Sequence, residues 1–291
     1  MVYIMQMFSS RQIISCLSFL MISFSGGSLT DAAPQVLLED NFDSYPTGPR
    51  ATWTEYMPGF GTQRWIIAGL PSAASIPEAR VIADASAFGR TGKVFGYTES
   101  GYSIVGEDEI GHYPYIYTNL PTAYSGTDSW KLSLDFYADQ VSSTAGYWLT
   151  ALYPNSSRVG AQRLLSVDVR YNTTTETTQL RFLHKGLPGG EGATVVTAFD
   201  IDLDTWHHIE ITGNNATQQL TLHLQGQDPV SGYYFSDQNI INTIGLGDIA
   251  SAFTAPSSTV YLDNFKLETI PEPTAIALLG LSALCLARRR K

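Results

Sequence analysis

The chain has 291 residues, of which 44% are hydrophobic and 15% are charged, a balance typical of globular protein. The body at residues 34–269 holds 12 basic and 25 acidic residues, so its net charge is about −13. Such a surface repels phosphate backbones, and we expect no nucleic-acid partner. Cys16 and Cys285 lie outside the body, which excludes disulfides, thiol catalysis and cysteine-ligated zinc from it.

The N-terminal segment has the three parts of a secretory signal peptide. Arg11 precedes an apolar run at residues 13–24, and small and polar residues follow as far as Ala33. A positively charged n-region, an apolar stretch of this length and small residues at the cleavage site are typical of a cleaved leader. We therefore predict a signal peptide over residues 1–32. The alternatives are a lipoprotein signal at Cys16 and a buried N-terminal helix.

The body consists of short predicted strands separated by turn residues. Trp130, Leu132, Leu134 and Phe136 alternate with polar residues, which is the period-2 pattern of a half-buried strand. Similar runs occur at residues 147–153, 165–171, 179–183, 194–199, 207–211, 220–224 and 259–267, and residues 213–215 predict a hairpin turn. No body segment has a sustained helical repeat. These features predict one all-β domain over residues 34–269, an antiparallel β-sandwich of jelly-roll type.

Several body segments resemble parts of laminin-G and other concanavalin A-like domains. Residues 202–211 are similar to a turn and strand with a Trp-His step in those domains, and residues 220–226 supply the expected partner strand. Residues 39–45 and 260–267 look like first and last strands, which commonly pair in such jelly rolls. The resemblance implies a concanavalin A-like fold, and it carries no activity with it.

Carboxylates near these first and last strands form a candidate metal site. If the two strands pair, Asp40 and Asp43 lie near Asp263. Hard oxygen ligands at strand ends suit Ca²⁺ far better than zinc. Two interpretations remain open, a structural calcium ion held by these three residues and an acidic surface without an ion.

Tyrosines form a candidate carbohydrate-binding surface. Tyr113, Tyr115 and Tyr117 share one face of a predicted strand. Their side chains combine an apolar ring with a polar tip, which suits sugar rings as well as protein partners. The alternative is that these tyrosines fill the core of the sandwich.

No recognisable set of catalytic residues occurs in the sequence. The alternating acids of glucan-cleaving jelly rolls, Glu-x-Asp-x-x-Glu, are missing, and so is the Gln-x-His strand of alginate-lyase-like jelly rolls. Serine hydrolase and zinc-helix motifs are also missing. His207 and His208 are neighbours on a predicted strand, so they point to opposite faces and we expect them to be structural. We assign no catalytic residue.

The C-terminal segment also has three parts. Pro271, Glu272 and Pro273 come first, apolar residues 274–287 follow, and Arg288, Arg289, Arg290 and Lys291 end the chain. A helix of the apolar residues would be about 21 Å long against about 30 Å of hydrocarbon, so we predict a short, marginal transmembrane helix. The terminal cations would hold that end in the cytoplasm and place the body outside.

This order of parts resembles the PEP-CTERM sorting signal of exported proteins in Gram-negative bacteria that make extracellular polysaccharide. The resemblance places a sorting signal at residues 270–291. It implies that an exosortase recognises Pro271, Glu272 and Pro273, and that Arg288, Arg289 and Arg290 act as a cytoplasmic stop. It also implies a transient membrane anchor before delivery to the cell surface or extracellular matrix. The alternative is an ordinary tail anchor.

Two functions are compatible with these features. The first is an exported surface or matrix protein whose body is a non-catalytic glycan-binding or structural module, with extracellular polysaccharide as its partner. The second is a divergent glycoside hydrolase or polysaccharide lyase of jelly-roll fold. The missing acid pattern favours the first function.

Overall fold

The computed structural model of the chain describes residues 33–49, 56–58, 64–68, 80–99, 115–126, 129–141, 147–155, 163–249 and 258–270. The predicted leader, the tail at residues 271–291 and Tyr113 lie outside these residues, as does the side chain of Tyr115. The described part of the chain contains no helix that could span a bilayer.

The described residues form strands and one short 3₁₀ helix, η3 (Ala85–Phe88). The strands are, in chain order, β1 (Val36–Asp40), β2 (Gly48–Pro49), β3 (Tyr56–Pro58), β4 (Arg64–Ala68), β5 (Arg80–Asp84), β6 (Lys93–Glu99), β7 (Tyr115–Tyr124), β8 (Ser129–Gln140), β9 (Tyr147–Tyr153), β10 (Leu165–Asn172), β11 (Thr177–Lys185), β12 (Thr194–Asp200), β13 (Trp206–Asn214), β14 (Gln219–Leu224), β15 (Val230–Tyr233), β16 (Ile241–Ile249) and β17 (Ser258–Ile270). The predicted runs from residues 130–136 to residues 259–267 all lie in strands, and the all-β prediction is confirmed. Of residues 39–45, which were compared with a first strand, only 39 and 40 lie in β1.

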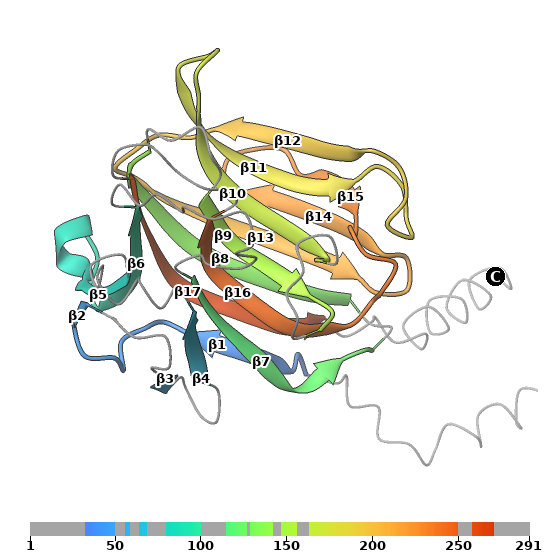
Figure 1. Cartoon of the computed structure of the whole chain (residues 1–291), viewed down its shortest axis with the longest axis horizontal. Coiled ribbons are helices and arrows are strands. Elements are labelled where there is room, and N and C mark those ends of the chain that lie inside the picture. Colours follow the sequence, from blue (N-terminus) through green and yellow to red (C-terminus); the bar gives the residue numbers. More distant parts are fainter. Residues whose placement is uncertain are drawn as a thin grey trace, which may run out of the picture. The chain divides into compact units, whose positions relative to one another are not determined.

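The strands form two antiparallel sheets (Figure 1). Sheet A has the order β12–β11–β10–β9–β16–β7–β4–β3. Sheet B has the order β15–β14–β13–β8–β17. Strand β17 pairs further with β1 along one half and with β6 along the other, and β6 pairs with β5, which pairs with β2. One residue pair, Lys185 with Tyr233, joins β11 to β15. The arrangement is the predicted jelly-roll sandwich.

The first and last strands of the body pair, as the concanavalin A-like resemblance implied. Glu39 lies opposite Lys266 in the β1–β17 ladder, and Asp40 lies opposite Phe265. The ladder is extended by Thr269, whose N–H donates to the carbonyl of Gln35 at 2.9 Å.

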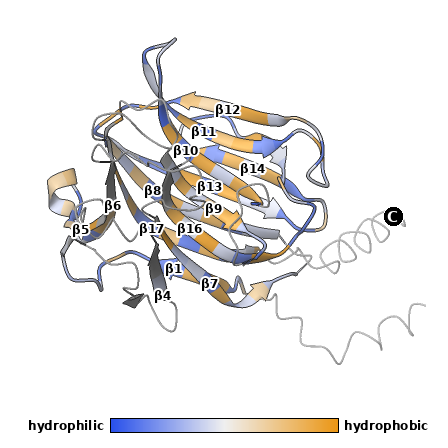
Figure 2. Ribbon diagram, in the orientation of Figure 1, coloured by the Kyte–Doolittle hydropathy of each residue, from blue (hydrophilic) through white to orange (hydrophobic). Residues whose placement is uncertain are grey.

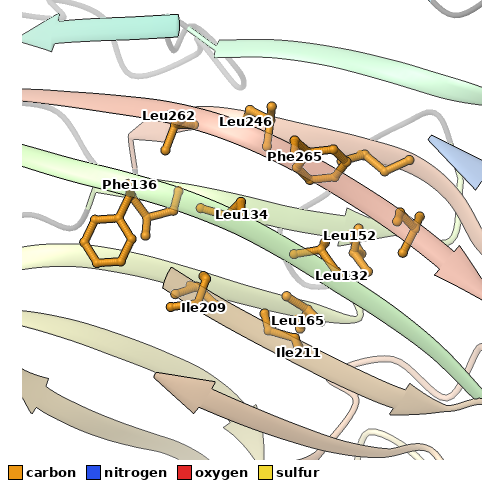
Figure 3. Packing of buried hydrophobic residues seen from close by; sticks show 14 of the residues in the cluster. Leu132, Leu134, Phe136, Leu152, Leu165, Ile209, Ile211, Leu246, Leu262 and Phe265 are labelled. Carbon is orange, nitrogen blue, oxygen red and sulfur yellow. The ribbon is translucent and has the colours of Figure 1, made fainter. Parts of the chain in front are cut away.

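The core lies between the two sheets, and it follows from the alternation of apolar and polar residues along the strands (Figure 2). Along β11, for example, every second side chain is buried. Figure 3 shows the packing of buried side chains, among which it labels Leu132, Leu134, Phe136, Leu152, Leu165, Ile209, Ile211, Leu246, Leu262 and Phe265. Burial of each contributes roughly 1.5–3 kcal/mol to folding before the entropy cost is counted.

The predicted hairpin turn is displaced along the chain. Strand β13 continues through Gly213 to Asn214, and the turn to β14 lies at residues 215–218. The reason is packing, because a Cβ at Gly213 would lie 2.1 Å from the indole of Trp130. That indole is buried, and its Nε1 donates to the hydroxyl of Tyr234 at 2.8 Å. Gly213 therefore makes room for a core tryptophan and does not form the turn.

Candidate functional site

The first candidate site lies on the outer face of sheet A, where β9, β10 and β11 are neighbours. Val167 and Val169 belong to the core, so Asp168 between them points to the outer face. In the ladder, Asp168 lies opposite Trp148 of β9 and Arg181 of β11. We call the set Trp148, Arg163, Asp168, Arg170 and Arg181 the arginine face.

An ion pair lies at the centre of the arginine face. Arg181 donates to both carboxylate oxygens of Asp168, with 2.6 Å between Nε and Oδ1. The side chain of Asp168 is 0% exposed. Burial raises the pKa of Asp168, while the hydrogen bonds and charge of Arg181 and the charges of Arg170 and Arg163 oppose that rise. Since three guanidinium groups surround one carboxyl group, the arginine face is positive in either protonation state of Asp168.

Arg163 reaches the arginine face from the segment just before β10. Its guanidinium carbon lies 4.9 Å from the centre of the Trp148 ring and 4.3 Å from the centre of the Phe235 ring. A cation over an aromatic face gains roughly 0.5–2 kcal/mol. The two rings therefore hold the charge of Arg163 in place on this side of the sheet.

Buried polar atoms without partners occur on the same strands. Thr150 and Ser166 are both 0% exposed. The hydroxyl oxygens of both residues and Nε of Arg170 have no hydrogen-bond partner among the residues that the structure describes. Thr150 lies opposite the core residue Val167 and therefore does not share the outer face of sheet A, whereas Ser166 lies beneath that face beside Asp168. Of these groups, only Arg170 is partly exposed on the arginine face.

Tyr117 lies on the outer face of sheet A as well. Ile116 is in the core, so Tyr117 beside it faces outward, and its side chain is half-buried. Tyr117 lies opposite Gly245 of β16, which in turn lies opposite Ala151 of β9. Tyr115 is placed by its backbone opposite Ala68 of β4. These opposite residues run across the sheet from β7 through β16 to β9, so Tyr117 lies on the same side of sheet A as the arginine face.

A second polar region lies on the outer face of sheet B. It is a cavity of about 670 Å³, and its lining residues are Asn41, Asp43, Gly89, Arg90, Thr91, Asp135, Asp263 and Asn264. We call it the Arg90 cavity. Its residues come from the loop after β1, the loop after η3, and strands β8 and β17.

Arg90 connects two carboxylates in this cavity. Its Nη1 lies 2.6 Å from Oδ2 of Asp135 and 3.5 Å from Oδ2 of Asp263. Asp135 also binds Nδ1 of His208 at 2.6 Å and accepts a hydrogen bond from Nδ2 of Asn264 at 2.9 Å. Both oxygens of Asp135 are therefore occupied by groups of the protein itself.

The two carboxyl groups that bind Arg90 differ in acidity. Burial raises the pKa of Asp263 to about 6, against the backbone N–H of Asn264 and the charge of Arg90, and the charge of Asp135 raises it further. Burial also acts to raise the pKa of Asp135, but hydrogen bonds from Asn264, His208 and Arg90 together lower it. Asp135 is thus the permanent anion of the pair, and Asp263 titrates near neutral pH.

The predicted calcium ligands are divided between two places. Asp43 and Asp263 line the Arg90 cavity, as the pairing of first and last strands implied. Asp40 is buried elsewhere, where it accepts hydrogen bonds from Tyr45, from Nε1 of Trp65 and from the N–H of Phe42. Within the described residues, no group of three or more His, Cys, Asp or Glu side chains could hold a metal ion. A calcium site stays a prediction, and Asp40 has no oxygen to spare for it.

The two neighbouring histidines lie on opposite faces of β13. His207 stacks on Phe136, with 5.0 Å between ring centres, and His208 binds Asp135 in the Arg90 cavity. Arg90, Asp135 and the arginine face were not predicted as site residues from the sequence. For Asp168 and Arg181 a signal was present, because oppositely charged residues stand at the polar positions of two adjacent predicted strands.

Comparisons with known proteins support the predicted sorting signal and the predicted fold. Residues 269–291 match the PEP-CTERM protein-sorting motif, which indicates an exported protein that is processed by an exosortase and sorted to the cell surface. No curated protein matches the chain.

Two solved structures have the same fold as the body. One is alginate lyase A1-II′, a member of polysaccharide lyase family 7, with 12% identity, a TM-score of 0.51, and coverage of 74% of this chain and 92% of that chain. The other is a variant of that family 7 lyase in complex with its substrate GGMG, with 13% identity, a TM-score of 0.50, and coverage of 72% and 89%. At this identity the similarity establishes the jelly-roll fold, and activity has to be argued from the residues of this chain.

Proposed function

We propose that the chain is an exported cell-surface or extracellular-matrix protein whose body binds an acidic extracellular polysaccharide without cutting it. The observation that supports this proposal is the arginine face. Three guanidinium groups gather around one carboxyl group there, although the body as a whole carries a net charge of about −13. A concentration of arginine on one face of an acidic protein is suited to an anionic ligand.

The chemistry of the arginine face fits carboxylate-bearing sugars. Guanidinium groups bind carboxylates through two parallel hydrogen bonds, and they do so better than lysine does. Trp148 and Tyr117 are both partly exposed and offer aromatic surface for sugar rings. Each contact is modest, so we expect weak binding to a short oligosaccharide and stronger retention on long chains that repeat the contact.

The alternative function is a polysaccharide lyase, and the fold shared with alginate lyases favours it. A lyase needs a positioned base to remove a proton from the sugar. The described strands of sheet A contain one histidine, His184. Its ring lies 4.9 Å from that of Phe182, a core residue, and it therefore points away from the arginine face. This placement favours binding over cleavage.

Affinity electrophoresis in gels that contain alginate tests the proposal, with neutral dextran as the control polymer. We expect alginate alone to retard the protein. Arg163→Gln and Arg170→Gln should each weaken retention about tenfold, which corresponds to the loss of one charge-assisted contact. Tyr117→Ala should weaken it less. Lys131→Gln is the matched control, because it removes a positive charge from sheet B, where Lys131 pairs with Glu210 and Glu268.

Two outcomes would contradict binding through the arginine face. One is the absence of retardation in alginate, and the other is an equal loss of retention in Lys131→Gln, which would mean a non-specific charge effect. New unsaturated products in the same samples, detected by their ultraviolet absorbance, would establish the lyase instead.

The proposed route to the cell surface has its own test. An exosortase would recognise Pro271, Glu272 and Pro273 in a Gram-negative host, and the anchor at residues 274–287 would hold the protein in the membrane only until processing. Intact-mass measurement of the protein from its host should then show loss of about 20 C-terminal residues. Retention of Arg288, Arg289 and Arg290 on the surface-exposed form would rule out this route.

A further inference from the structure

Strand β12 forms an exposed edge of sheet A (Figure 1). It pairs with β11 from Thr194, opposite Lys185, to Asp200, opposite Gln179, without any shift in register. Among the described strands, only β11 pairs with it. The other side of β12 therefore presents backbone N–H and C=O groups in a regular row, which is a template for a further strand.

This edge is also apolar. Three of the five large apolar side chains that are exposed among the described residues lie on β12 or on the hairpin leading into it, namely Leu187 at 54%, Val195 at 37% and Val196 at 46%. No lysine, arginine or proline occurs between Thr194 and Asp200. Natural proteins usually place such residues on free edges to prevent pairing between molecules.

The other described edge strands have protective features that β12 lacks. The ladder of β1 contains a register shift, β2 is two residues long and ends in Pro49, and β3 ends in Pro58. Strand β15 has only four residues. Short strands, prolines and irregular ladders all block edge-to-edge association. The difference indicates that the regular edge of β12 is kept for a partner.

We propose that this partner is a second copy of the chain, whose β12 pairs antiparallel with the first about a two-fold axis at Thr197. In that register Val195 faces the partner's Phe199, and Val196 faces the partner's Ala198. Asp200 faces the partner's Thr194. Apolar residues thus oppose apolar residues, and no like charges are opposed. The same surface serves both copies, as a closed two-fold dimer requires.

The dimer joins the two sheets A into one continuous sheet. Ala198 lies opposite Arg181 in the ladder, so the outer face of β12 continues the arginine face. Two arginine faces would lie along one surface and contact one long polymer, which raises retention without any new contact. The dimer goes beyond the proposed function and does not depend on it.

Sedimentation of the full chain in mild detergent, without polysaccharide, tests the dimer. We expect a concentration-dependent dimer whose dissociation constant rises by about tenfold or more in Val196→Lys, because an ammonium group is placed in an apolar strand pair. Val36→Lys is the matched control, since Val36 is 45% exposed on the edge strand β1 and should leave the dimer unchanged. A monomeric wild type, or equal effects of both variants, would overturn the proposal.

A cross-linking experiment tests the register. In a chain with Cys16→Ser and Cys285→Ser, Thr197→Cys should form a disulfide-linked dimer on oxidation, because the two copies of residue 197 face each other. Thr194→Cys should not, since its two copies would lie about 20 Å apart along the strands. Cross-links at both positions, or at neither, would overturn this register. Failure of alginate binding would leave both results untouched, so the two proposals are tested separately.

Discussion

The arginine face on sheet A and the Arg90 cavity on sheet B are built from the same residue types in opposite proportions. On sheet A, the charges of Arg163, Arg170 and Arg181 all act on Asp168. On sheet B, Arg90 lies between Asp135 and Asp263, with Asp43 in the same cavity. In the proposed function, the net positive charge of the first region attracts the polysaccharide, whereas the cation of the second is held by carboxylates of the protein. On this proposal the ratio of charges, and not the presence of an ion pair, distinguishes a binding surface from a structural network.

Each region also places a guanidinium group over a tryptophan, and the surroundings again differ. Arg90 lies 3.9 Å from the centre of the Trp206 ring, whose Nε1 donates to the carbonyl of Phe88 at 2.9 Å. Phe88 in turn packs on Tyr137 and Tyr261. This aromatic cluster ties η3 to sheet B. Arg163 packs instead against two rings, those of Trp148 and Phe235.

The largest expected effect comes from removing the central carboxylate of the arginine face. Asp168→Ala should reduce the free energy of unfolding by about 3–5 kcal/mol, because it leaves buried cations without compensation. Asp135→Ala should cost about 1–2 kcal/mol, since its partner Arg90 is 29% exposed and is hydrated when unpaired. Chemical denaturation of both variants measures the difference. Equal losses would remove the distinction between the two regions.

A reciprocal pair of substitutions should separate stability from binding. Arg90→Met should lower the free energy of unfolding by about 1 kcal/mol, because Asp135 and Asp263 then lack their shared cation, and it should leave retention in alginate gels unchanged. Arg170→Met should weaken retention with little effect on stability. Denaturation and affinity electrophoresis on the same preparations would show the crossover. If both variants change the free energy of unfolding and the retention to the same extent, the two regions do not differ in function.

The titration of Asp263 gives an effect that depends on pH. Its folded pKa of about 6 exceeds the ordinary value of 3.8, so the folded state binds the proton more tightly. Stability is therefore highest below pH 4 with respect to this group, and it falls as the pH rises from 4 to 6. Asp263→Asn should remove that fall and stabilise the protein at pH 7 by about 1 kcal/mol.

Asp200 is the control for that titration, because its pKa is shifted in the opposite direction. Hydrogen bonds from Gln179 and Thr177 lower its pKa, so it contributes stability at neutral pH that is lost as the pH falls. Asp200→Asn should not stabilise the protein at pH 7. Thermal unfolding between pH 4 and pH 8 compares the two variants, and the same sign for both would contradict the assignment.

The smallest expected effect is that of calcium. A site built on Asp43 and Asp263 would add only about 0.4 kcal/mol of stability when the calcium concentration equals Kd. Asp43→Ala or Asp263→Ala should abolish the corresponding rise in melting temperature. Magnesium at equal concentration is the control, because any divalent cation interacts with a body of this net charge. Equal shifts with both ions would mean that the Arg90 cavity holds no calcium.

The strands could be predicted where one face is buried and the other is exposed to solvent. The alternation in β8, β11 and β14 made them recognisable, and the Asp168–Arg181 pair joins two predicted strands that are adjacent in sequence. The sequence analysis did not identify β16, whose glycines weaken the apolar signal. The turn after β13 was misplaced because the packing of Trp130 against Gly213 is a tertiary effect.

The Arg90 cavity could be predicted only in part. The pairing of first and last strands brought Asp43 and Asp263 together, as expected. Arg90 and Asp135 are 45 residues apart in sequence, and Arg90 and Asp263 are 173 apart. No local pattern records such contacts, because they arise from the order of strands in sheet B. The displacement of Asp40 into a buried network with Trp65 has the same origin.

The position of β17 has a consequence for the order in which the body folds. This last strand is central to sheet B, because it pairs with β1, β6 and β8. A chain that crosses a membrane from its N-terminus leaves those three strands without their shared neighbour until residues 258–270 have emerged. Closing such distant contacts is slow, since loop-closure entropy is lost before any pairing energy is gained. We therefore expect this part of sheet B to close only when the segment directly before the sorting motif has arrived.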